Sequence, residues 1–166
     1  MSDSTSNPNE TDELPGDGTD AAPEAAADPA AEGTELDELA RLAKKDPSPQ
    51  TLEPLWKGTM NLDRWYFAGV GQFPKMRPFS GFIDEEPYVM AFTTRARAEK
   101  YARVQNLVKE GDKPSVMAFP AVEGAKLCVA QHNLGAKWVV FDDGWGAWRF
   151  PLNELAGMVQ RYREDA

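Results

Sequence analysis

The sequence predicts an α+β fold in which helices cover a mixed sheet of about five to six strands. Two observations lead to this prediction. Segments with the alternating pattern of strands are interleaved with segments whose apolar residues recur at helical spacing. Two pairs of expected strands are joined by short polar or glycine-rich loops, which are typical of antiparallel hairpins. At 166 residues, the chain is long enough for one domain.

The first 33 residues form an acidic tail that is rich in alanine and proline. They carry nine acids and no Lys or Arg, which leaves 18 acids against 18 bases in the rest of the chain. Their few large apolar side chains cannot offset the backbone entropy of ordering, which is about 1–2 kcal/mol per residue. We therefore expect residues 1–33 to be disordered and residues 34–166 to form one domain, with helices in residues 34–61 and the core in residues 62–166.

Charge and composition argue against several classes of partner. A formally neutral domain lacks the surplus of Lys and Arg that nucleic acids require. No apolar stretch approaches the roughly 20 residues that span a bilayer. The single cysteine, Cys128, excludes an intramolecular disulfide and a cysteine-rich zinc site. Acids stand where a secretory signal needs basic and apolar residues, so we expect a cytoplasmic protein with no membrane or nucleic-acid partner.

Two helices are expected first. Thr34 has the pattern of an N-cap with an acid, Asp37, three residues later, and apolar residues then recur at helical spacing. The two prolines in residues 46–49 should end this helix. Thr51 is then expected to cap the second helix and to place Pro54 in its first turn.

Strands and two helices fill the middle of the chain. Thr94 is expected to begin a helix that runs to about Lys109 with Val104 on its inner face. Gly135 should stop a further helix at about residues 121–133. The expected strands are residues 65–70, 79–83, 88–92 and 115–119, of which the second and third flank an acidic hairpin loop at residues 84–87.

A second hairpin and a final helix complete the expected domain. Its strands are residues 137–142 and 147–150, and the loop between them contains Gly144 and Gly146. Pro151 is expected to start the last helix, because proline is favoured at the first helical position.

Three groups of motifs in the expected core resemble the SseB-like family. Residues 65–67 (Trp-Tyr-Phe) are followed by a strand and helix at residues 88–101, whose Phe-Thr-Thr and Arg-Ala-x-x-Tyr are similar to the family's Phe-Thr-Ser and Arg-Ala-x-x-Tyr. A helix that ends in glycine leads into a strand at residues 138–142 (Trp-Val-Val-Phe-Asp). Residues 150–155 (Phe-Pro-Leu-Asn-Glu-Leu) resemble the family's closing strand and helix. The resemblance covers roughly residues 62–160.

The resemblance implies a bacterial protein with the fold of the SseB protein N-terminal domain. Members of the family are linked to enhanced serine sensitivity or to type III secretion, and neither link implies a catalytic residue. The chain departs from the family at residues 142–144, which read Asp-Asp-Gly where many members have an Asn-Pro-Gly-like turn. The resemblance therefore implies a regulatory or protein-binding role whose molecular activity is uncharacterised.

Aromatic residues gather on the second expected hairpin. Strand alternation places Trp148 and Phe150 on one face of the sheet. Trp145 lies in the turn between two glycines, where a large ring is hard to bury. A tryptophan in such a turn is either a binding contact or a clamp onto a neighbouring helix. Trp145 and Trp148 are therefore candidate partner-binding residues.

The helix expected from residue 94 carries a run of basic residues, Arg95, Arg97, Lys100 and Arg103. Arg95 and Arg103 each lie four positions from Glu99, so part of this charge can be paired on a solvated face. The other interpretation is a basic surface that receives an acidic segment, including the protein's own tail. These four residues are also candidate partner-binding residues.

The remaining reactive side chains are expected to be structural. Cys128 and His132 lie four positions apart in one helix, a spacing at which they could touch. A thiol in the middle of a helix between Leu127 and Val129 is typical of a buried, inert cysteine, and a histidine near a helix end favourably meets the carbonyl dipoles. The acidic residues of both hairpin loops lack the spaced ligands of a calcium loop, so we expect no metal, cofactor or catalytic residue.

We therefore expect a non-catalytic protein-binding or regulatory module with an unidentified protein partner, and not an enzyme. The alternative is a small-molecule sensor with a pocket lined by tryptophans, and a hydrolase that uses Cys128 and His132 comes third. A pocket of about 300 Å³ or more with convergent polar groups would favour the sensor or the enzyme. A flat apolar patch would favour the protein-binding module.

Overall fold

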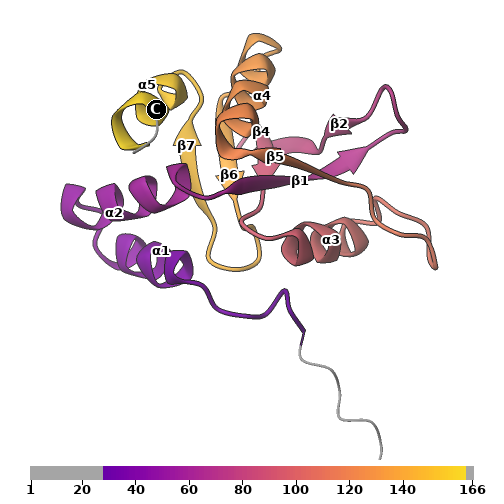
Figure 1. Cartoon of the computed structure of the whole chain (residues 1–166), viewed down its shortest axis with the longest axis horizontal. Helices are drawn as coiled ribbons and strands as arrows, with labels where there is room; N and C mark the ends of the chain where they lie inside the picture. Colours follow the sequence, from indigo (N-terminus) through magenta and orange to yellow (C-terminus); the bar gives the residue numbers. More distant parts are fainter. Residues whose placement is uncertain (1–27, 164–166) are drawn as a thin grey trace, which may run out of the picture.

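The computed structural model describes residues 28–163 of the chain. Within this range, five helices pack around seven strands that form two sheets (Figure 1). The α+β class predicted from the sequence is thus confirmed, although the strands form two sheets and not one. Most of the expected disordered tail, residues 1–27, lies outside the described residues.

Most elements lie where the sequence patterns indicate. The helices are α1 (Glu35–Lys45), α2 (Pro49–Met60), α3 (Arg95–Val104), α4 (Ala121–Asn133) and α5 (Leu155–Tyr162). The strands are β1 (Arg64–Val70), β2 (Arg77–Pro78), β3 (Ser80–Ile83), β4 (Glu86–Ala91), β5 (Val116–Pro120), β6 (Trp138–Phe141) and β7 (Trp148–Pro151). The strand that the patterns do not indicate is β2, which has only two residues.

The two sheets differ in strand direction. In the first, of order β2-β1-β5, both neighbours run antiparallel to β1. In the second, of order β3-β4-β6-β7, the central pair is parallel and both outer pairs are antiparallel hairpins. The parallel pair is possible because a long connection through α3, β5 and α4 carries the chain back to the same edge. The sheets meet where Tyr66 and Phe92 exchange backbone hydrogen bonds of 3.0 and 2.8 Å.

Side-chain caps fix the starts of the first two helices. Thr34 caps α1 as expected, because its backbone N–H donates to the Asp37 carboxylate (2.7 Å) and its hydroxyl accepts from the Asp37 N–H (3.3 Å). For α2 the expected cap is wrong. Ser48 is the N-cap, Pro49 occupies the first turn, and the Thr51 hydroxyl accepts the N–H of Ser48 at 3.2 Å. The N-cap of α2 thus lies three residues before the position predicted from the sequence.

Two other helix boundaries differ from the sequence pattern. Helix α3 ends at Val104 and not near Lys109, because Asn106 adopts a left-handed backbone conformation with φ of 55°. Val104 is therefore exposed and does not face inward. Helix α5 begins at Leu155, because Pro151 pairs with Trp138 at the end of β7.

The two faces of the four-stranded sheet enter different hydrophobic clusters. The larger cluster contains Phe150 and receives side chains from α1, α2, α4 and α5. The smaller cluster contains Met90 and Tyr101 and lies between this sheet and α3. In β7, Trp148 and Phe150 are buried and Arg149 is exposed, which confirms the expected alternation.

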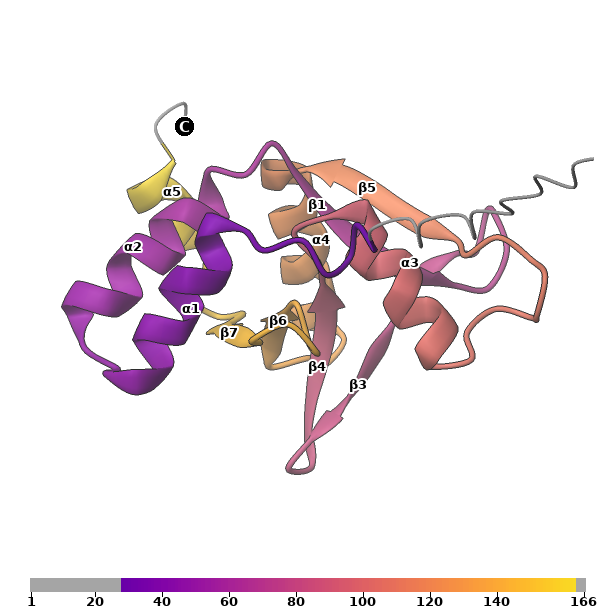
Figure 2. The same ribbon diagram turned by 90° about the horizontal axis from the view of Figure 1, so that it is seen from below.

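The segment just before α1 packs against the domain. Residues 28–33 belong to the expected tail by composition, yet Ala30 is 2% exposed and its carbonyl accepts from Arg97 Nε at 3.4 Å. Figure 2 shows this indigo segment running from α1 to α3. The expectation of disorder is therefore wrong for these residues. Among the described helices, none has the length and apolar character needed to cross a membrane.

Candidate functional site

A groove of about 300 Å³ lies between α3 and the loop that joins β6 to β7. We call it the Trp145 groove, and it is lined by Lys100, Tyr101, Val104, Gln105, Asp143, Gly144 and Trp145. The parallel strands β4 and β6 place it, because Ala91 and Phe141 are paired and the residues that follow them emerge at the same edge of the sheet. Ligands of open sheets with parallel strands commonly bind beyond this carboxyl edge.

A buried ionic network lies under the groove. Arg97, which is 1% exposed, donates to the Asp142 carboxylate at 2.7 Å and to both oxygens of Asp37 at 2.7 and 2.6 Å. Asp142 also accepts from the backbone N–H of Thr93 at 2.9 Å and from its hydroxyl at 2.6 Å. These contacts satisfy the guanidinium and the Asp142 carboxylate together, as charges removed from water require.

The network shifts the ionisation of its members. Burial raises the pKa of Asp142, although hydrogen bonds from Thr93 and the charge of Arg97 oppose this effect. For Asp37, partial burial also acts to raise the pKa, but the hydrogen bonds from Arg97 and Thr34 outweigh it and the net shift is downward. Burial acts to lower the pKa of Arg97, but its two carboxylate partners raise it overall. Arg97 therefore remains a cation held between two acids.

The same arginine joins segments that are distant in the sequence. Besides Asp37 of α1 and Asp142 after β6, Arg97 donates to the carbonyl of Glu32 at 3.0 Å. Its guanidinium carbon lies 5.5 Å from the ring centre of Trp145, within the range of a cation–π contact. The N-terminal segment, α1, α3 and the β6–β7 loop are therefore held together directly beneath the Trp145 groove.

Trp145 is half-buried. Besides Arg97, its ring meets Phe92 edge-to-face at a centroid distance of 6.5 Å, and its remaining surface lines the groove. Gly144 and Gly146 on either side have φ of 96° and 107°, a left-handed conformation that side chains other than glycine rarely adopt. Trp145 thus contacts α3 through Arg97, as a clamp onto a neighbouring helix would, and it also lines the groove, where a binding contact would lie.

The other candidate residues are not all at the groove. Lys100 lines it and pairs with Asp28 of the N-terminal segment. Arg97 is buried, so its interpretation as an exposed partner contact is wrong. The same correction applies to Trp148, which is 8% exposed in the larger cluster and donates from Nε1 to the Thr59 hydroxyl at 3.1 Å.

The two remaining basic residues of α3 point elsewhere. Arg95 lies 3.9 Å from Glu99 and 5.9 Å from the ring centre of Tyr66. Arg103 donates to the carbonyl of Asp112 at 3.3 Å. The expected basic run is therefore divided, and of its members Lys100 alone lines the groove.

The reactive side chains of α4 lie away from this site. Cys128 is fully buried in the larger cluster, and burial raises the pKa of its thiol well above the ordinary value. His132 Nδ1 lies 2.9 Å from the carbonyl oxygen of Ala136, to which it can donate. In the described part of the chain, no group of three or more His, Cys, Asp or Glu side chains is placed to hold a metal ion.

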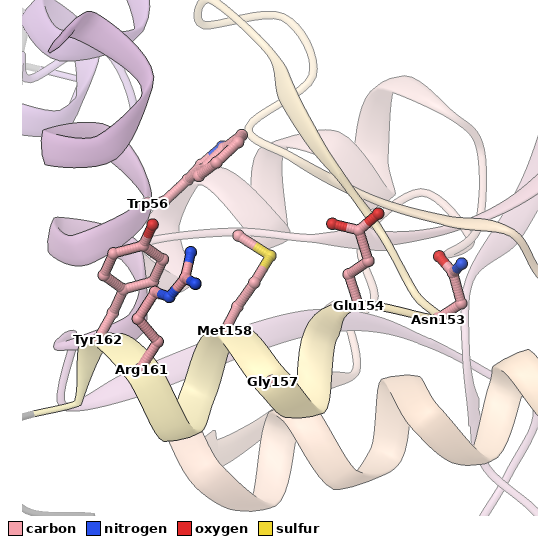
Figure 3. Close-up of a pocket in the computed structure, with 7 residues that line it drawn as sticks. All are labelled: Trp56, Asn153, Glu154, Gly157, Met158, Arg161 and Tyr162. Atoms are coloured by element: carbon pink, nitrogen blue, oxygen red, sulfur yellow. The ribbon is translucent and has the colours of Figure 1, made fainter. Parts of the chain in front are cut away.

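A second pocket, of about 330 Å³, lies between α2 and α5 (Figure 3). Its lining residues are Trp56, Asn153, Glu154, Gly157, Met158, Arg161 and Tyr162. Figure 3 shows Glu154 and Arg161 pointing to the same side of α5 as Trp56. Sequence reasoning misses this pocket, because Trp56 and α5 are far apart in the chain and no motif connects them.

The comparisons with known proteins do not extend these observations. No model of a known protein family matches the chain, and no curated protein matches it.

Proposed function

We propose that the protein is a non-catalytic protein-binding module of the SseB-like family and that the Trp145 groove is its docking surface. The observation that carries the proposal is the position of Trp145, accessible on one side and fixed from below by Arg97 and Phe92. Tryptophan is enriched among the residues that dominate binding energies at interfaces. A ring that is already held in place loses little conformational entropy when a partner binds.

The Trp145 groove, of about 300 Å³ with a mixed polar and apolar lining, is not the flat apolar patch expected for a protein-binding module, so the partner that fits it is one that inserts a side chain. Trp145 and Val104 offer apolar surface, and Lys100 offers a cation at the rim. An apolar or aromatic side chain of a partner, followed by an acid that reaches Lys100, would complement these groups. Asp28 of the protein's own chain already pairs with Lys100, which supports an acidic ligand at this rim.

The family proposal rests on the sequence motifs alone, and residues of one motif lie at this site. The Arg-Ala-x-x-Tyr motif supplies both the buried Arg97 and Tyr101 of the groove wall. At the point of departure from the family, Asp142 supplies the carboxylate that Arg97 binds. A buried Cys128 with a raised pKa supports a non-catalytic role, because a nucleophile must be accessible and ionised.

The test is affinity purification from the source organism with the wild-type chain, a Trp145→Ala variant and a Lys126→Glu control. Lys126 pairs with Glu123 on α4 and does not line the Trp145 groove. A partner retained by the wild type and the control but lost from Trp145→Ala is the expected result. Retention of the same proteins by all three chains would exclude the Trp145 groove as the docking surface.

A small-molecule sensor is the second candidate function, and the pocket of Figure 3 favours it. This pocket has the size and the mixture of polar and aromatic groups that small ligands use. A metabolite that raises the melting temperature of the wild type, but not of an Arg161→Ala variant, would support this function. Trp145→Ala should leave the shift unchanged, which separates this function from the first.

A further inference from the structure

Strand β3 forms an edge of the four-stranded sheet, with β4 as its neighbour on one side. Figure 2 shows the β3–β4 hairpin projecting away from the helices. An edge strand presents backbone donors and acceptors that another extended chain can bind.

The register of the hairpin identifies which backbone groups face outward. In an antiparallel pair, residues alternate between those bonded to the neighbour and those that point away from it. Phe82 lies opposite Pro87, which has no N–H, and the N–H of Met90 donates to Phe79 at 3.2 Å. Ser80 and Phe82 therefore direct their N–H and C=O groups away from β4. Within the described residues, no hydrogen bond reaches these outward groups.

Within β3 itself, two of the features that usually prevent pairing are absent. Natural edge strands are commonly protected by charged side chains, proline or a bulge. Between Pro78 and Asp84, β3 contains no charged residue and no proline. Phe82 is 74% exposed and Ile83 is 38% exposed. An apolar side chain therefore stands in solvent on the same residue whose backbone groups are unpaired.

The hairpin is ordered by two local features. Asp84 and Glu85 form a two-residue turn with φ of 51° and 66°, which matches the twist of the flanking strands. Gly81 leaves room for Tyr88, since a Cβ at position 81 would lie 2.7 Å from the Tyr88 hydroxyl oxygen. The outward groups of Ser80 and Phe82 are thus held in register before any partner arrives.

We propose that β3 is a strand-addition site that binds an extended segment of another protein carrying alternating apolar and basic side chains. The outward backbone groups of Ser80 and Phe82 supply the hydrogen bonds, and the Phe82 ring supplies apolar contact. Asp84 and Glu85 specify the charge, because neither has an ion-pair partner in the described range while Glu86 is held by Lys137 and Trp138. This site is separate from the Trp145 groove and does not depend on it.

The probe is a capped hexapeptide of alternating lysine and valine, titrated into the full-length ¹⁵N-labelled protein. We expect the amide signals of Ser80 and Phe82 to shift and their hydrogen exchange to slow. The same peptide with alternate amides N-methylated should lose binding, because it cannot complete the ladder. Replacing its lysines by glutamates should weaken binding several-fold. Shifts that map to the Trp145 groove and leave Ser80 and Phe82 unmoved would overturn the proposal.

Two variants at similarly exposed apolar residues distinguish binding at the edge strand from nonspecific hydrophobic binding. Phe82→Lys should abolish binding of the peptide, because it places a like charge on the edge. Leu134→Lys, at an 80% exposed apolar residue after α4, should leave binding unchanged. Equal loss in both variants would contradict a site on β3. A further outcome is possible without peptide: hydrogen exchange at Ser80 and Phe82 slows as the protein concentration rises, and dimers appear in the ultracentrifuge. That result would identify a second copy of this chain, and not another protein, as the partner.

Discussion

Arg97 lies in a helix whose other basic side chains, Arg95, Lys100 and Arg103, are exposed. Its guanidinium lies beside the first turn of α1, where the same Asp37 that closes the Thr34 capping box also pairs with Arg97. One carboxylate thereby serves local structure and a long-range contact. Helical spacing places Arg97 on the inner face of α3, four positions before Tyr101, but its charge alone groups it with the solvated basic residues of the helix.

Replacing Arg97 should be far more costly than replacing another arginine of α3. Arg97→Ala leaves the fully buried Asp142 without its cation, and losing one partner of a buried pair costs about 3–5 kcal/mol. Arg97→Lys keeps the charge but not the bidentate geometry, so its free energy of unfolding should lie between those of Arg97→Ala and the wild type. Urea unfolding followed by circular dichroism measures the difference. A loss for Arg97→Ala no larger than for Arg95→Ala would show that the network contributes little.

The thiol of Cys128 should not react in the native protein. It is fully buried, and its raised pKa keeps it protonated at neutral pH. A colorimetric disulfide reagent should modify it only after unfolding in urea, which serves as the positive control. Rapid modification of the folded protein would reopen the interpretation of Cys128 as a nucleophile.

At the scale of elements, sequence patterns predict centres well and ends poorly. The bounds of α4 agree with the pattern because Gly135, with φ of 106°, stops the helix as expected. The end of α3 does not agree with the pattern. Asn106 adopts a left-handed backbone conformation there, and the sequence contains no glycine or proline at that point that would predict it. Pro151 is favoured at helix starts and also at edge strands, and the pairing with Trp138 decides for the strand.

Truncation should separate two parts of the N-terminal segment. Removal of residues 1–27 leaves every described contact in place, so the melting temperature should change by no more than about 2 °C. Removal of residues 1–33 deletes the buried Ala30 and the Glu32 carbonyl that binds Arg97. This truncation should lower the melting temperature by clearly more than about 2 °C. Differential scanning calorimetry of both truncated proteins provides the measurement. Equal melting temperatures would show that residues 28–33 add no stability.

The acidic residues before Asp28 should associate loosely with α3. Asp28 already pairs with Lys100, and a tethered acidic segment has a millimolar effective concentration near Lys100 and Arg103. Exposed pairs are weak and screened by salt, so the contact should disappear at high ionic strength. Amide shifts of these two residues, with and without residues 1–27, at low and high salt, provide the test. Identical shifts at low salt would leave the tail without this role.

For the whole molecule, the sequence predicts the fold class and part of the site. The sequence predicts Trp145 from its position in a glycine-flanked turn and Lys100 from the run of basic residues, and both line the Trp145 groove. The Arg97–Asp142 pair and the pocket at Trp56 could not be found, because the parallel register of β4 with β6 and the packing of α2 on α5 create them. Such contacts depend on tertiary pairing and leave no periodic signal.

The central claim, that the Trp145 groove binds a protein, is tested most directly by photo-crosslinking in cells of the source organism. A photoreactive amino acid at Val104, exposed on the groove wall, should form an adduct with a partner protein. The adduct should vanish when Trp145→Ala is added, and the same probe at Leu134, exposed outside the groove, should form none. An adduct at Val104 that persists without Trp145, or that appears equally at Leu134, would contradict the claim.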